Sequence, residues 1–192
     1  MPESRAVRVR RSEKQWIAIM KRFESSSLGF PGYHRGVVPV IADVDEDAVK
    51  DIPQKIVTLR IIGREGSTFR GDDLILSLRG IGLRHGKFGI FHRIDGEDES
   101  RTIFSAASLV EPGSFDLANI KEQQIPGISL FMVLPGPVDG VEAFDMMMDA
   151  ARALAQGLDA EMLDESGSTL SIQRERYMRE EVIEFQRSTL VA

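Results

Sequence analysis

Four apolar segments of strand length follow one another from Gln54 onward, and each ends near glycine, proline or acidic residues. They are rich in β-branched and aromatic residues, which favour pleated strands over helices. We expect these strands at residues 56–62, 88–93, 102–110 and 128–134. None approaches the roughly 18 to 20 apolar residues that span a bilayer, so this part of the chain is expected to fold as a domain built around a sheet.

Two helical patterns interrupt and follow these strands, and a third helix is expected at the C-terminal end. Apolar residues recur at helical spacing over residues 72–82, and again from Pro137 to a stop near Gly157. Residues 160–170 contain a short hairpin pattern, and Ser171 is a suitable N-cap for the last helix. This order predicts an α+β fold, an antiparallel sheet of about six strands with split β-α-β connectivity and three helices packed on one face. The other face is expected to be exposed for peptide binding.

Composition limits the functions that this chain can have. It has 192 residues and no cysteine, which excludes disulfides, thiolate nucleophiles and cysteine-ligated metal centres. The 24 Lys and Arg residues are outnumbered by 30 Asp and Glu, for a formal net charge of -6. Such an acidic balance argues against broad electrostatic binding of nucleic acid.

The chain is expected to divide into two regions. Residues 1–53 are interpreted as an N-terminal extension or linker, largely disordered, and residues 54–190 as the folded domain. The first 22 residues contain seven Lys or Arg and two Glu, and a short amphipathic helix can form around Trp16 and Ile19. Contact of this helix with membrane phosphates is one interpretation, and a solvated tail is the preferred one. With no signal-peptide core and no transmembrane segment in it, the chain as it stands is expected to be cytoplasmic.

Alternation along the expected strands assigns their side chains to two faces. Val57, Phe91 and Phe104 fall on the side that we assign to the core beneath the helices. The opposite side carries apolar residues where a solvated face would be polar, and small residues there would leave a shallow trough for an amphipathic peptide. The alternative is that another helix or the N-terminal segment of the same chain covers this face. The predicted peptide-binding site consists of Ile56, Phe88, Ile90, Ala107, Leu109, Ser129 and Phe131.

No arrangement of residues in the sequence predicts a catalytic, metal or cofactor site. His34, His85 and His92 lack the spacing of metal ligands, and His92 has no recognisable nucleophile arrangement around it. The run Met146–Met148 is interpreted as core packing, because methionine at helical spacing usually fills a core. We therefore expect a protein that is not an enzyme and that needs no metal and no cofactor.

Two further hypotheses use the same sheet face. Aromatic residues on an open antiparallel sheet can stack bases, so Phe88 and Phe131 permit a single-stranded RNA-binding module. The acidic balance of the folded region argues against nucleic acid as a partner, because stacking platforms lie in positively charged grooves. The other hypothesis is intramolecular, with this face docking Trp16 and Ile19 of the N-terminal region.

Three stretches carry a resemblance to a known family. They are Ile90-Phe91-His92-Arg93, the segment from Phe104-Ser105 through Pro112-Gly113 to Phe115-Asp116, and the segment from Pro126-Gly127 through Phe131-Met132 to Pro135. On these motifs, residues from about Gln54 to Arg187, about 70% of the chain, resemble the C-terminal domain of ZipA, the bacterial cell-division protein that binds the tubulin-like FtsZ. Glu111 stands where a lysine is common in that family, which weakens charge pairing with an acidic peptide.

The resemblance implies a non-enzymatic adaptor that binds the C-terminal tail of FtsZ as a short, partly helical peptide on the exposed sheet face. It also implies a role in stabilising the division ring and attaching it to the inner membrane during septum assembly. The contact positions of the family fall on the seven residues of the predicted peptide-binding site. We expect a monomeric domain on the cytoplasmic side of the inner membrane at the division site. Membrane contact is expected only through an anchor that is missing from this chain or lies upstream.

Overall fold

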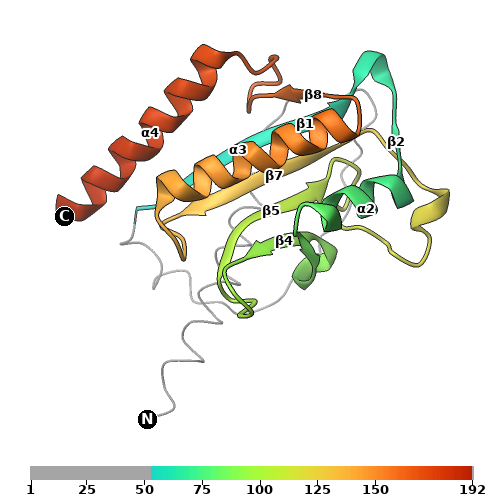
Figure 1. Ribbon diagram of the computed structural model, residues 1–192, viewed down its shortest axis with the longest axis horizontal. Coiled ribbons are helices and arrows are strands. Elements are labelled where there is room, and N and C mark those ends of the chain that lie inside the picture. The colour runs from blue at the N-terminus through green and yellow to red at the C-terminus, as the bar shows by residue number, and fades with distance from the viewer. Residues whose placement is uncertain (1–52, 192) are drawn as a thin grey trace, which may run out of the picture.

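The structure is a computed structural model, and it describes residues 53–191 of the chain (Figure 1). The described residues form an α+β fold whose main sheet has six antiparallel strands in the order β3-β4-β5-β7-β1-β8, as the sequence predicts. These strands are β1 (Lys55–Gly63), β3 (Arg84–His85), β4 (Phe91–Ile94), β5 (Thr102–Ser108), β7 (Gly127–Leu134) and β8 (Ala160–Leu163).

Three α-helices within residues 53–191 pack against this sheet, and they are α2 (Gly71–Gly80), α3 (Gly140–Gly157) and α4 (Ile172–Val191). In Figure 1, α2 and α3 lie on the same side of the sheet, and α3 runs along β7 and β1. The last helix, α4, packs against α3 and contributes Met178 and Val182 to the same core. The expected arrangement of helices on one face is therefore confirmed.

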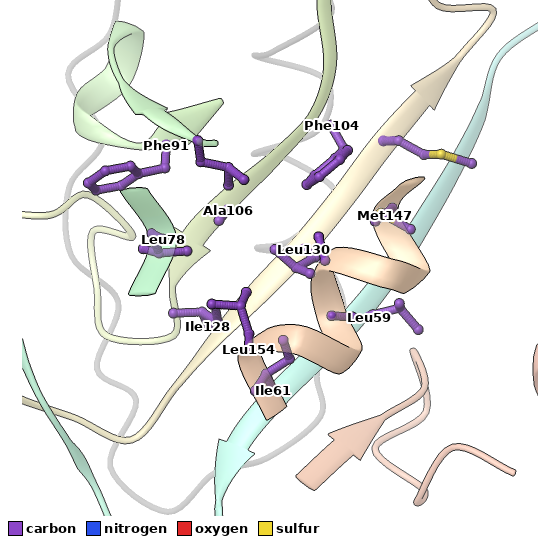
Figure 2. Close-up of a cluster of buried hydrophobic side chains, with 14 of the residues drawn as sticks. Leu59, Ile61, Leu78, Phe91, Phe104, Ala106, Ile128, Leu130, Met147 and Leu154 are labelled. Carbon is purple, nitrogen blue, oxygen red and sulfur yellow. The ribbon is translucent and has the colours of Figure 1, made fainter. Parts of the chain in front are cut away.

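The main core lies between the sheet and these helices. Alternate strand residues point toward α3, which crosses them in Figure 2. The methionine run of α3 belongs to this core, because Met147 and Met148 are buried and Met146, which is partly buried, packs against the core. Its interpretation as core packing is confirmed. The labelled core residues of Figure 2 are Leu59, Ile61, Leu78, Phe91, Phe104, Ala106, Ile128, Leu130, Met147 and Leu154.

The two long helices begin at residues whose side chains cap them. Asp139 Oδ1 accepts hydrogen bonds from the backbone N–H groups of Val141 and Glu142, at 3.0 and 3.1 Å, and so fixes the start of α3. Its other oxygen accepts a hydrogen bond from Gln186 Nε2 at 2.8 Å, which joins the start of α3 to α4. Ser171 caps α4, as expected, by accepting a hydrogen bond from a backbone N–H of its first turn.

Two features of the sheets differ from the sequence-based expectation. A second, two-stranded sheet pairs β2 (Phe69–Arg70) with β6 (Gln124–Ile125), and strands of two residues are too short to show a periodic pattern. The expected hairpin near residue 165 is reduced to one bridge between Leu163 and Thr169, and β8 pairs instead with β1. Pairing with a distant strand leaves no signal in the local sequence.

The expected strand over residues 88–93 is wrong in its first half, since β4 begins only at Phe91. Residues Lys87–Gly89 form a 3-10 turn, in which Phe88 and Gly89 have φ values of 61° and 66°. Two successive residues in the left-handed region reverse the chain and cannot belong to a strand. Phe88 therefore projects from a turn at the end of the sheet. Similar 3-10 turns occur at Arg64–Gly66 and Ile120–Glu122.

Several expectations concern the N-terminal region, and these lie outside the described residues. They are the linker or tail over residues 1–53, of which only residue 53 is described, and the amphipathic helix around Trp16. Within residues 53–191, none of the helices combines the length and the apolar character that crossing a membrane requires.

Candidate functional site

The second face of the main sheet, opposite α2 and α3, carries alternate residues of β1, β4, β5 and β7. Strand register places Phe131 between Thr58 and Ser105, in one row across three strands. In the next row Ala107 lies opposite Ser129. The predicted division of these strands into a core side and an opposite side is therefore correct.

Three apolar side chains of the second face, Ile90, Ala107 and Phe131, form a second-face cluster that is separate from the main core. Their exposed fractions are 1%, 7% and 2%, and Ile56 and Val133 pack against them. The expectation of an exposed patch is wrong for these three side chains. Alternation fixes the side of the sheet to which a residue points, but it does not determine what packs over that side.

The small residues expected to leave an open trough are buried as well. Ser129 is buried, and its hydroxyl donates a hydrogen bond to the Leu59 carbonyl oxygen at 3.4 Å. Nearby, Gly127 allows Leu109 and Ile62 to close over β7, since a Cβ on Gly127 would lie 2.8 Å from Leu109 Cδ1 and 2.9 Å from Ile62 Cγ2. Part of the expected trough is therefore filled by neighbouring apolar side chains.

Exposed apolar residues lie at one edge of the second face. Phe88, in the turn before β4, is 46% exposed, and Val110, just after β5, is also exposed. The two segments are joined, because the backbone N–H of Phe115 donates a hydrogen bond to the carbonyl oxygen of Gly89 at 2.7 Å. Of the predicted site residues, Phe88 is exposed and Leu109 is half-buried at this edge.

His92 is held by hydrogen bonds at both ring nitrogens. Its Nε2 lies 2.9 Å from the Lys87 carbonyl oxygen, and because a carbonyl can only accept, Nε2 carries the proton. Nδ1 then accepts a hydrogen bond from the Ser105 hydroxyl at 2.8 Å. Burial lowers the pKa of His92, so the ring is neutral near pH 7. This geometry ties the turn before β4 to β5, which is a structural role.

Arg60 is a residue of the second face that the sequence did not single out as part of a site. It lies on β1 between Ser129 and Leu163, and its Nη2 is 3.5 Å from the carbonyl oxygen of Glu165. Its Nε is buried and has no hydrogen-bond partner among residues 53–191. A single arginine in a strand is common and does not by itself indicate a site. The sequence signal for its position is its even spacing from Ile56 along the strand, which puts both side chains on the same face.

These features define a class of protein, an α+β interaction domain with one sheet face packed on helices and a segregated apolar cluster on the other. The sequence adds the particular family. A sequence model described as "ZipA, C-terminal FtsZ-binding domain" matches residues 55–181, so the chain belongs to the family of ZipA C-terminal FtsZ-binding domains.

Individual relatives of the chain agree with this assignment. The cell division protein ZipA of Xanthomonas euvesicatoria pv. vesicatoria is 38% identical over 134 residues, which cover 69% of this chain and 55% of the relative. ZipA of Xylella fastidiosa (strain Temecula1) is 38% identical over 138 residues, covering 71% and 57%. ZipA of Stutzerimonas stutzeri is 36% identical over 161 residues, covering 78% and 59%. The chain thus matches a little over half the length of these relatives.

Proposed function

We propose that this chain is a non-enzymatic cell-division adaptor that binds the C-terminal tail of FtsZ. In this proposal the tail lies on the second face and contacts the seven residues of the predicted peptide-binding site. Stabilisation of the division ring, its attachment to the inner membrane and a monomeric domain on the cytoplasmic side belong to the same proposal.

The family match over residues 55–181 is the observation that carries the proposal. The second-face cluster supports it, because a globular domain needs one core, and here a second apolar group is kept apart from that core on the opposite side of the sheet. Phe88 supports it further, because a large aromatic side chain that is 46% exposed at the edge of this face provides an accessible anchor for a peptide.

The experiment is a titration of the full chain with a labelled FtsZ C-terminal peptide from the same organism, followed by fluorescence anisotropy. Phe88→Ala is expected to weaken binding by more than about tenfold, because it removes an aromatic anchor. Leu76→Ala is the matched control, since Leu76 is 66% exposed but lies on α2, on the helix side of the sheet. Equal affinities of the two variants for the tail would contradict the proposed site.

The RNA-binding alternative draws no support from the comparisons, which point to an FtsZ-binding family. Charge also argues against it. Residues 53–192 contain 15 Lys or Arg and 22 Asp or Glu, a net charge of -7. A groove that follows a nucleic-acid backbone needs the opposite sign.

A further inference from the structure

The second-face cluster lies on the side of the main sheet opposite α2 and α3, so those two helices do not cover it. Ile90 and Phe131 are almost fully buried, although α2 and α3 lie on the other side of the sheet. The apolar side chains of residues 53–191 that pack against the cluster are Ile56 and Val133. Both lie on the same face as the cluster, where they are paired across the adjacent strands β1 and β7.

We propose that residues 14–23 of this same chain are the cover, and that they compete with the FtsZ tail for the second face. The competition rests on the proposed function. Trp16, Ile19, Met20 and Phe23 follow the i, i+3, i+4, i+7 spacing of one helical stripe. Lys14, Lys21 and Arg22 fall away from that stripe, so an amphipathic segment would present its aromatic side to the cluster and its basic side to solvent.

Charge complementarity favours this occupant. Residues 1–23 contain seven Lys or Arg and two Glu, whereas residues 53–192 have a net charge of -7. The acidic turn between β4 and β5 borders the second face, because Glu99 lines the same hollow as His92, Ser105 and Phe131. The net positive charge of residues 1–23 would therefore be attracted toward the acidic groups at the rim of this docking site.

The connecting chain can reach the second face and still keeps the effective concentration of the segment there high. The 31 residues from Glu24 to Gln54 separate the segment from β1. A flexible chain of this length has an r.m.s. span of roughly 30 Å, which gives an effective concentration of about 1 mM. For a segment with a bimolecular Kd of about 0.1 mM, the ratio of docked to undocked chains would then be about ten to one. Docking would therefore weaken binding of the FtsZ tail about tenfold.

Trp16 is the single tryptophan of the chain and reports directly on docking. In the full chain we expect its emission to be blue-shifted and protected from acrylamide. A saturating FtsZ-tail peptide without tryptophan is expected to shift the emission to the red and to restore quenching. Reciprocally, Ile56→Glu on the second face should expose Trp16, whereas Leu76→Glu on α2 should leave it protected.

The matched pair of variants keeps Trp16 in place. Ile19→Asp with Phe23→Asp breaks the apolar stripe, and Gln15→Asp with Ala18→Asp adds the same charge to the same segment off the stripe. The stripe variant should expose Trp16 and raise the affinity for the FtsZ tail about tenfold. The off-stripe variant should retain both wild-type properties.

Each other outcome overturns a defined part of the proposal. Identical Trp16 emission in the wild type and the stripe variant excludes docking. Equal tail affinities of the stripe and off-stripe variants exclude competition. Emission that changes on dilution identifies a second copy of the chain as the occupant and overturns intramolecular docking. If Trp16 is protected but no variant binds the tail, docking stands and the proposed function fails.

Discussion

At the residue scale, Phe88 and Phe91 stand three positions apart in opposite environments. Phe91 is fully buried against His85 and Phe115, with ring centroids 5.2 and 5.3 Å away. Phe91→Ala is expected to lower the free energy of unfolding by about 3–5 kcal/mol, because the cavity cannot close. Phe88→Ala should change it by less than about 0.5 kcal/mol. Urea denaturation measures both, and a Phe91→Ala variant of wild-type stability would contradict the register of β4.

A second residue-scale prediction concerns pH. Burial lowers the pKa of His92 below its ordinary value, so as pH falls the unfolded chain takes up the proton before the folded chain does. The contribution of the neutral His92 ring to the free energy of unfolding is fully present above about pH 6.5, and it is lost as pH falls through the folded-state pKa. Urea denaturation between about pH 7.5 and pH 5.5 should show falling stability in this window.

His92→Gln provides the control for that measurement. Glutamine can keep a polar contact with Lys87 or Ser105 but does not titrate, so the variant should be less stable near neutral pH and less sensitive to acid. An equal decline in the wild type and in His92→Gln would assign the pH dependence to other groups.

The side of the sheet on which each of these residues lies could be predicted, but its environment could not. Alternation placed Phe91 in the core and Phe131 on the opposite side, because neighbouring side chains of a strand must point in opposite directions. The burial of Phe131 depends on what lies over the sheet, which is a long-range property. The turn at Phe88 was missed for a local reason, since Phe88 and Gly89 both adopt positive φ values that no periodic pattern announces.

At the scale of elements, the junction of α3 with α4 depends on Asp139. Hydrogen bonds from Gln186 and from two backbone N–H groups hold the pKa of Asp139 below its ordinary value. Asp139→Ala is expected to lower the free energy of unfolding by about 1 kcal/mol, as loss of an N-cap usually does. Asp139→Asn should lose less, because the amide oxygen still caps the helix. Thermal unfolding distinguishes the two, and equal losses would show that the cap contributes little.

Long periodic elements were predictable and short ones were not. The α3 pattern ran over five turns and predicted the helix correctly. β2 and β6 have two residues each, and their pairing joins segments more than 50 residues apart. Long-range pairing also decides β8, whose partner is β1 at the opposite end of the domain sequence. Such pairings are set by the tertiary fold, so a single sequence read locally does not contain them.

At the scale of the whole molecule, the distribution of charge separates peptide recognition from nucleic-acid binding. The described domain is acidic, and the apolar cluster of the second face is bordered by the acidic turn that contains Glu99. Burial of apolar groups is nearly independent of salt, whereas phosphate contacts release counterions. The two modes of binding therefore differ in one measurable quantity, the slope of the logarithm of the affinity against the logarithm of the salt concentration.

We expect the affinity for the FtsZ tail to change by less than about threefold between about 50 and 200 mM salt, because only a few exposed charges are screened. A protein that makes six to ten phosphate contacts loses roughly a thousandfold or more over the same range. Anisotropy titrations at several salt concentrations give the slope, and a single-stranded RNA oligonucleotide serves as the comparison ligand. A steep slope for the tail, or RNA binding of comparable affinity, would contradict recognition through the apolar cluster. Phe88→Ala should weaken binding of the tail but leave the salt slope unchanged, since that variant loses an apolar contact and keeps the same charges.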